Sequence, residues 1–257
     1  MDLEKTRETA EQSEPNVVPP HPELLMAARH GDNERIKHFL KTITQSPVAP
    51  LPAGEVVVHV EKVATIRQTT VGDGTESAAA VTLAEAVTVA WDSVLHVVAS
   101  SGDEPEFLQS ATAIYVNASH LLGAGNKKGD TPLHCAARAG RVRMLSHLVD
   151  LACGNDGATG DGAAKSVVRT QNAKGETALH VAVRFGSTEM VRVLMSADPE
   201  LARVVPADGA SPLYLAVSLG HIRIARKLHE LDNALSYAGP DGKNALHASV
   251  VKGKGEC

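Results

Sequence analysis

Histidines are the side chains of this 257-residue chain best suited to bind a metal or to act as general bases, and there are twelve of them. Four of these, His96, His134, His180 and His247, each follow a leucine in similar short segments. A metal ion needs ligands that converge on one point. Equivalent positions of successive segments lie one segment apart, so we interpret these histidines as structural and predict no metal site.

Two other arrangements resemble catalytic motifs only superficially. Cys135 adjoins His134, but neighbours along a helix do not face each other, so the pair lacks the geometry of a nucleophile and its base. The stretch 157–166 has two glycines at the spacing of a phosphate-binding loop, but two alanines separate Lys165 from the second glycine and no buried strand precedes it. We predict no catalytic residue, no cofactor and no enzymatic activity.

Composition argues against several kinds of partner. Seven aromatic residues are too few for a base-stacking platform, and a net charge of −5 gives no electrostatic reason to bind nucleic acid in general. The most apolar window, 78–90, spans 13 residues and is too short to cross a bilayer. The N-terminus has no signal-peptide pattern and the three cysteines have no paired spacing. We therefore expect a cytoplasmic chain without a membrane segment and without a nucleic-acid partner.

The chain repeats itself, and this repetition organises everything else. The segment 129–140 recurs at 175–186 and at 209–220, with weaker copies near 24, 91 and 242. In all six copies a leucine and a closing glycine are seven residues apart. The pairs are Leu24 and Gly31, Leu95 and Gly102, Leu133 and Gly140, Leu179 and Gly186, Leu213 and Gly220, and Leu246 and Gly253.

Each copy has the signals of a short helix. Thr131 and Ser211 are suitable N-caps, and a proline follows each of them in the first turn. The closing glycine can enter the left-handed region and end the helix. Apolar residues then resume at helical spacing, as over 142–153, which predicts a second antiparallel helix. One such pair cannot bury its apolar stripe alone, so the pairs must stack.

The unit resembles the ankyrin repeat, whose Thr-Pro-Leu-His motif stands here at 131–134 and whose length is about 33 residues. The resemblance implies an all-α ankyrin-repeat solenoid of helix-turn-helix units with β-turn fingers. It also implies that the motif histidine ties a turn to neighbouring backbone. The structural motif residues are Thr131, Pro132, Leu133, His134, Gly140, Thr177, Leu179, His180, Gly186, Leu213, Gly220, Leu246 and His247.

The intervals between copies predict the domain organisation. We expect a disordered acidic tail over 1–20, a degenerate first repeat over 22–40, and an insertion over 41–90 to which we assign no structure. Repeats then fill 91–253. Their predicted bounds are 91–125, 126–171 with a loop insertion over 152–171, 172–205, 206–238 and an incomplete 239–253.

More narrowly, the segments 92–103 and 126–140 resemble plant ankyrin proteins of the accelerated-cell-death type. Members usually carry transmembrane helices after a Pro-Gly-Gly motif, associate with the plasma membrane or endomembranes, and act in defence and salicylic-acid signalling. This sequence has neither the motif nor the helices. We therefore expect a truncated product whose last helix leaves Leu246, Val250 and Val251 uncovered, and which can self-associate there.

The most plausible function is a non-catalytic protein-interaction scaffold with a protein partner, linked by the resemblance to plant defence signalling. The alternative is the cytoplasmic ankyrin portion of a multi-pass membrane signalling protein. Arginines five residues after the repeat leucine could present a basic ladder to an acidic segment or could pair with nearby acids, and variable charges mark the turn tips. The candidate binding residues are Arg29, Arg138, Arg184, Lys127, Lys128, Asp130, Lys174, Glu176, Asp208, Asp241 and Lys243.

Overall fold

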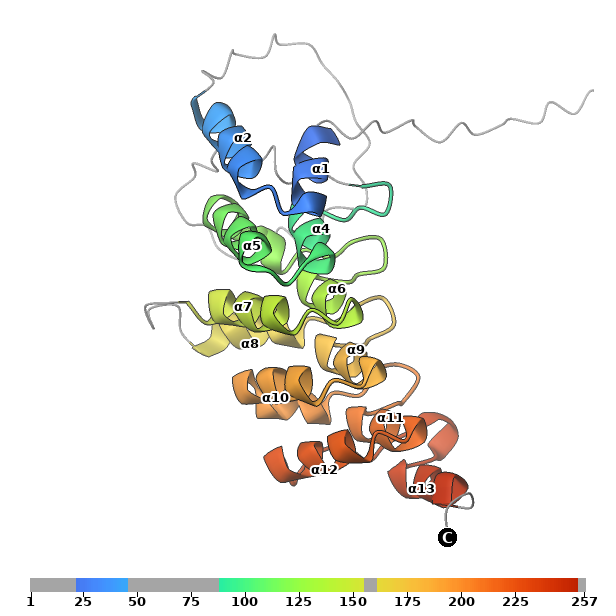
Figure 1. The fold of residues 1–257 in the computed structure, drawn as a ribbon. Helices are drawn as coiled ribbons and strands as arrows, with labels where there is room; N and C mark the ends of the chain where they lie inside the picture. The colour runs from blue at the N-terminus through green and yellow to red at the C-terminus, as the bar shows by residue number, and fades with distance from the viewer. Residues whose placement is uncertain (1–21, 46–87, 155–160, 254–257) are drawn as a thin grey trace, which may run out of the picture.

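A computed structural model describes residues 22–45, 88–154 and 161–253 of the chain. These residues form helix pairs that stack on one another into a single elongated solenoid (Figure 1). The predicted tail over 1–20, most of the insertion over 41–90 and the middle of the predicted loop lie outside the described residues.

Helices of two kinds alternate along the chain. The first helices of the pairs are α1 (Pro22–His30), α4 (Val94–Ser101), α6 (Pro132–Arg138), α9 (Ala178–Phe185), α11 (Pro212–Leu219) and α13 (Ala245–Gly253). The second helices are α2 (Asn33–Gln45), α5 (Pro105–Asn117), α7 (Val142–Cys153), α10 (Thr188–Ala197) and α12 (Ile222–Leu231). Short helical segments occur at η1 (Ser119–Leu122), η2 (Pro199–Arg203) and η3 (Pro240–Gly242). The described residues form no β-sheet, apart from an isolated bridge between Ala238 and Asn244, and the predicted all-α class is confirmed.

Each first helix from α1 to α11 packs against the first helix of the next pair and against its own second helix. The repeat leucine faces this contact, and Leu95, Leu133 and Leu179 have no exposed surface. Small residues beside them, such as Ala136 and Ala182, are equally buried and let the helices approach closely. One continuous core therefore runs from α1 to α13, as stacked repeats require.

The ends of the first helices follow the expected chemistry. Ser211 accepts a hydrogen bond from the backbone N–H of Tyr214, and Thr131 forms a capping box with His134. At the other end, Gly186 has φ +86°, and its N–H donates to the carbonyls of Ala182 and Val183. This left-handed turn reverses the chain into the second helix.

One part of the predicted organisation is wrong. The predicted loop over 152–171 contains a helix, α8 (Asp161–Arg169), which contacts α7 and α10. Ala164 and Val168 are buried in that contact, so the apolar positions of a short helix are satisfied by tertiary packing despite flanking glycines. The degenerate first repeat is a true helix pair, with α2 running to Gln45 beyond the predicted boundary at 40.

The last described helix, α13, packs against α11. Its other apolar side chains face solvent, with Leu246, Val250 and Val251 exposed by 72%, 58% and 76%. No helix among the described residues combines the length and the apolar character that a bilayer span needs.

Candidate functional site

Two of the motif histidines form equivalent buried hydrogen bonds between successive repeats. The ring Nδ1 of His134 accepts from the backbone N–H of Thr131 at 3.2 Å, so its Nε2 carries the proton and lies 2.9 Å from the carbonyl oxygen of Glu176 in the next repeat. His96 makes the same pair of contacts, with its Nε2 2.8 Å from the carbonyl of Asp130. These are contacts of structural histidines, each joining two repeats.

His180 lacks the second of these hydrogen bonds. Its Nδ1 accepts from the N–H of Thr177 at 3.1 Å, but among the described residues its buried Nε2 makes no hydrogen bond of good geometry, although the backbone of Val204 lies nearby. Burial lowers the pKa of His96 and His134, and it lowers the pKa of His180 to about 4. The rings are therefore neutral at pH 7.

The side chains that could suggest catalysis are not arranged for it. Burial raises the pKa of the Cys135 thiol to about 12, and the Nδ1 of the adjacent His134 is already engaged by its N-cap. Lys165 and Ser166 lie within helix α8. In the described part of the chain, no group of three or more His, Cys, Asp or Glu side chains is placed to hold a metal ion.

The turns before the first helices form fingers that touch one another. The N–H of Lys127 donates to the carbonyl of Ala90 in the preceding finger at 3.0 Å, and the N–H of Ala173 donates to the carbonyl of Lys128 at 2.8 Å. Within a finger, the Oδ1 of Asn126 accepts from two backbone N–H groups. Fingers 88–93, 126–131 and 172–177 thus form one continuous ledge, which we call the finger row.

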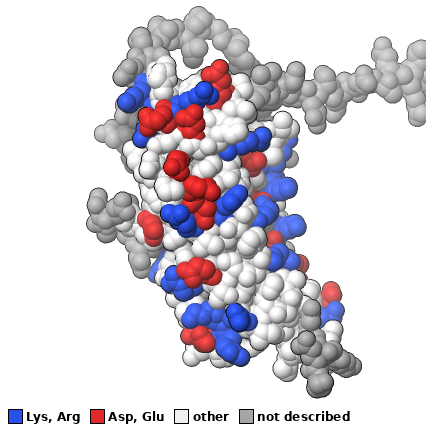
Figure 2. Space-filling view, in the orientation of Figure 1, with Lys and Arg blue, Asp and Glu red and all other residues white. Residues whose placement is uncertain are grey.

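Lysines occupy the tips of the finger row. Lys127, Lys128 and Lys174 are exposed, and none of them forms an ion pair with a carboxylate among the described residues. Lys and Arg gather along the edge of the molecule where the fingers project (Figure 2). The finger row therefore carries a local positive field on a chain whose net charge is −5.

The arginine ladder has another arrangement. The guanidinium of Arg138 contacts the carboxylate of Asp130 at 2.6 Å, and that of Arg184 contacts Glu176 at 2.7 Å. Burial alone would raise the pKa of Asp130, but hydrogen bonds from Arg138 and Asn172 hold that pKa below its usual value. Pairing with nearby acids, the alternative that the sequence left open, is the observed state.

Asp130 and Glu176 were predicted as surface contacts at the finger tips, and this is wrong. Their side chains are exposed by only 0% and 6% because each points inward to its arginine. Asn172 also donates to the Oδ1 of Asp130 at 2.9 Å, which links two fingers. These two acids belong to the scaffold.

The remaining candidates lie away from this centre. Asp208 is exposed at the next finger tip, where its carboxylate caps the N–H of Ala210 at 3.0 Å. Asp241 and Lys243 face each other at 3.7 Å in the last finger. Arg29 is exposed at the end of α1. The structure thus brings together the lysines of the finger row with Arg138 and Arg184, and leaves the others apart.

A second set of contacts between repeats was missed. Arg203 in η2 donates to both carboxylate oxygens of Asp232, at 2.8 and 3.1 Å, and Arg169 pairs with Asp198 one repeat earlier. The signal was present, since both the two arginines and the two aspartates are 34 residues apart. These bidentate pairs each join two successive repeats.

Comparison with known proteins agrees with this geometry. The family model described as ankyrin repeats in three copies matches residues 95–203 and 158–236, which together are more than half of the chain. No curated protein matched the chain. With its stacked helix pairs, fingers and motif histidines, this chain belongs to the ankyrin-repeat family.

Proposed function

We propose that the chain is a non-catalytic scaffold that binds an acidic segment of a protein partner along the finger row. The observation that carries this proposal is the set of three exposed lysines, Lys127, Lys128 and Lys174, on fingers fixed to one another by backbone hydrogen bonds. Exposed cations attract carboxylates, and because the backbone of the fingers is already fixed, only the lysine side chains have to be ordered on binding. Arg138 and Arg184 add no net charge to the finger row, because each is paired with a carboxylate.

The lysines give a cleaner test than the arginines. A glutamate at position 138 would face the buried carboxylate of Asp130 and would destabilise the fold itself. The double variant Lys128→Glu/Lys174→Glu changes only exposed side chains. Its matched control is Arg223→Glu/Arg226→Glu, which makes the same change of charge on exposed positions of α12.

The experiment is a pull-down from the source tissue with the tagged chain, at low and at raised salt. We expect partners that are lost with the lysine variant, retained with the control, and weakened by salt because exposed charges are screened. Circular dichroism should be the same for all three proteins. A lysine variant that is folded and retains every partner would contradict the proposal.

We also propose, on the resemblance of 92–103 and 126–140 to the accelerated-cell-death type, that this binding serves plant defence signalling linked to salicylic acid, in the cytoplasm. The alternative is that the chain is the cytoplasmic ankyrin part of a multi-pass membrane signalling protein. Sequencing the full transcript separates the two, because apolar 20-residue segments downstream would favour the alternative.

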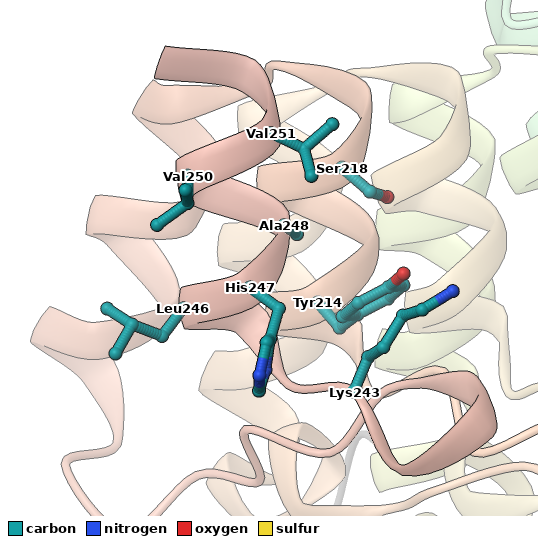
Figure 3. Close-up of a pocket in the computed structure, with 8 residues that line it drawn as sticks. All are labelled: Tyr214, Ser218, Lys243, Leu246, His247, Ala248, Val250 and Val251. Carbon is teal, nitrogen blue, oxygen red and sulfur yellow. The ribbon is translucent and has the colours of Figure 1, made fainter. Parts of the chain in front are cut away.

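Self-association is a second contact that we propose. Leu246, Val250 and Val251 line an open groove of about 540 Å³ beside Tyr214 and Lys243 (Figure 3). Exposed apolar patches of this kind favour association. Sedimentation of the wild type should depend on concentration, and Leu246→Lys/Val250→Lys should abolish that dependence. A wild type that stays monomeric at every concentration would refute it.

A further inference from the structure

Trp91 occupies a position where the other fingers have glycine. Its N–H donates to the carbonyl of Thr88 at 2.8 Å, as the N–H of Gly129 does to Asn126 and that of Gly175 does to Asn172, both at 2.8 Å. The φ of Trp91 is +61°, against +70° for Gly129 and +76° for Gly175. The single tryptophan of the chain therefore stands in the left-handed region.

This conformation is unfavourable for a side chain as large as tryptophan. The finger imposes it, because the Oγ1 of Thr88 accepts from the N–H groups of Ala90 and Asp92 at 3.2 and 3.1 Å. The indole gains little packing in exchange, since Trp91 is 58% exposed and lies outside the core. The fold does not explain this side chain, and strained, exposed residues are concentrated at functional sites.

Trp91 stands at one end of the finger row. The carbonyl of the preceding residue, Ala90, accepts from the N–H of Lys127 at 3.0 Å, so the two fingers are in direct contact. A groove of about 390 Å³ between them is lined by the cations Lys127, Lys128 and Arg138 and by the carboxylates Asp92 and Asp130. Trp91 is not part of this lining, but it directly follows Ala90, which is. The indole therefore belongs to the finger that borders the groove and the lysines.

We propose that Trp91 is the apolar anchor of the finger row, and that the partner segment carries a bulky aliphatic or aromatic residue beside its acidic residues. Tryptophan is enriched among the interface residues that contribute most to binding energy. The apolar residue packs on the indole while the carboxylates pair with Lys127, Lys128 and Lys174. This inference rests on the proposed function and adds to it the second determinant of specificity.

A peptide fits these residues better than a lipid surface. Binding to anionic membranes through surface charge typically uses clusters of four to eight Lys or Arg, whereas the finger row has three unpaired lysines. Exposed Asp208 follows at the next finger, and the chain as a whole is negative. Three lysines followed by an acidic residue favour a short acidic segment over an extended anionic membrane surface.

The test is selection of binders from a random dodecapeptide display library on the full chain. On the wild type we expect enrichment of Asp and Glu together with one Leu, Ile, Phe or Trp. On Trp91→Gly the apolar preference should disappear and the acidic preference should remain, while Lys128→Glu/Lys174→Glu should lose the acidic preference. Acidic peptides without any apolar preference on the wild type would overturn the anchor and leave the proposed function standing. No acidic preference at all would overturn both.

Two further measurements separate an anchor from a structural role. A selected peptide without tryptophan should shift the emission of Trp91 to shorter wavelength, and it should bind Trp91→Gly at least tenfold more weakly. The urea midpoint of Trp91→Gly should equal or exceed that of the wild type, because glycine relieves the left-handed strain. Val89→Ser, another exposed apolar residue of the same finger, is the control and should bind normally. A lowered midpoint, an unchanged affinity of Trp91→Gly, or binding of the wild type to phosphatidylserine vesicles in place of the peptide would overturn the proposal.

Discussion

Acid should destabilise this protein in a pH window set by its buried histidines. Burial lowers the pKa of His180 to about 4, and it lowers the pKa values of His96 and His134 as well. Above pH 6.5 the imidazole is neutral in both the folded and the unfolded chain, so stability has its full value. Below pH 6.5 the imidazole binds a proton in the unfolded chain but not in the folded chain. The free energy of unfolding therefore falls with pH until the pKa of the folded state is reached.

The size of the effect follows from the shift. One pKa unit corresponds to about 1.4 kcal/mol, so at pH 5, some 1.5 units below the unfolded pKa, His180 alone lowers the free energy of unfolding by about 2 kcal/mol. At pH 4 the loss from His180 approaches about 3 kcal/mol. His96 and His134 act in the same direction. Asp130 and Asp198 have pKa values below the usual range of a carboxyl, so they stay ionised at pH 5 and do not contribute to this window.

The substitution His180→Gln tests this reasoning. Glutamine can still accept from the N–H of Thr177, as in a capping box, but it does not titrate. Urea unfolding followed by circular dichroism at pH 7.5 and pH 5 should show that the variant loses about 2 kcal/mol less than the wild type. His247→Gln is the matched control, because His247 has the same repeat position but is exposed. Equal losses for His180→Gln and the wild type would refute the assignment.

Three other predictions follow from single contacts. Asn172→Ala should lower the free energy of unfolding by about 2 kcal/mol, because it removes hydrogen-bond partners from the Oδ1 of buried Asp130 and from the backbone N–H groups of Lys174 and Glu176. A change under about 0.5 kcal/mol in urea unfolding would contradict this. Gly129→Ala should lower the urea midpoint markedly, because Gly129 has φ +70° and an added Cβ would lie 2.7 Å from the backbone nitrogen of Ala173. The control is Gly123→Ala, which should leave the urea midpoint unchanged because nothing lies within 4 Å of the added Cβ. In a Cys257→Ser background, alkylation at pH 8 followed by mass spectrometry should modify exposed Cys153 far faster than half-buried Cys135. A pKa of about 12 leaves roughly one Cys135 thiol in 10,000 ionised at that pH. Equal rates would show that the pKa of Cys135 is not raised.

The repeat pattern predicted the fold because each signal is local. A capping residue, a leucine and a glycine seven residues later define a helix and its end, and the same signals recur in each copy. The inward direction of Asp130 and Glu176 was not predictable in this way, because it depends on an arginine eight residues later in sequence and on Asn172 of the next finger. Helix α8 was missed for the same kind of reason, as its short apolar stripe is stabilised by contact with α7 and α10.

The contacts between fingers also vary along the stack. They are complete from Asp92 to Glu176, where Asn126 donates to Asp92 at 2.6 Å and Asn172 donates to Asp130 at 2.9 Å. In the next finger Pro206 replaces the asparagine and Ala210 replaces the acid. Within the described part of the chain, the Nε2 of His180 makes no hydrogen bond of good geometry.

Among the described residues, this network of asparagine and acid side chains therefore ends at the finger that carries Lys174, the last lysine of the finger row. A ligand that binds a preordered ledge loses less free energy to ordering than one that binds a loosely joined ledge. The fingers joined by asparagine contacts thus carry the exposed lysines and the strained tryptophan. A partner that binds both the lysines and the tryptophan should dissociate more slowly when the asparagine contacts are intact. Measuring the dissociation rate of a selected peptide from Asn126→Ala tests this: a rate equal to that of the wild type would mean that the rigidity of the fingers does not contribute to binding.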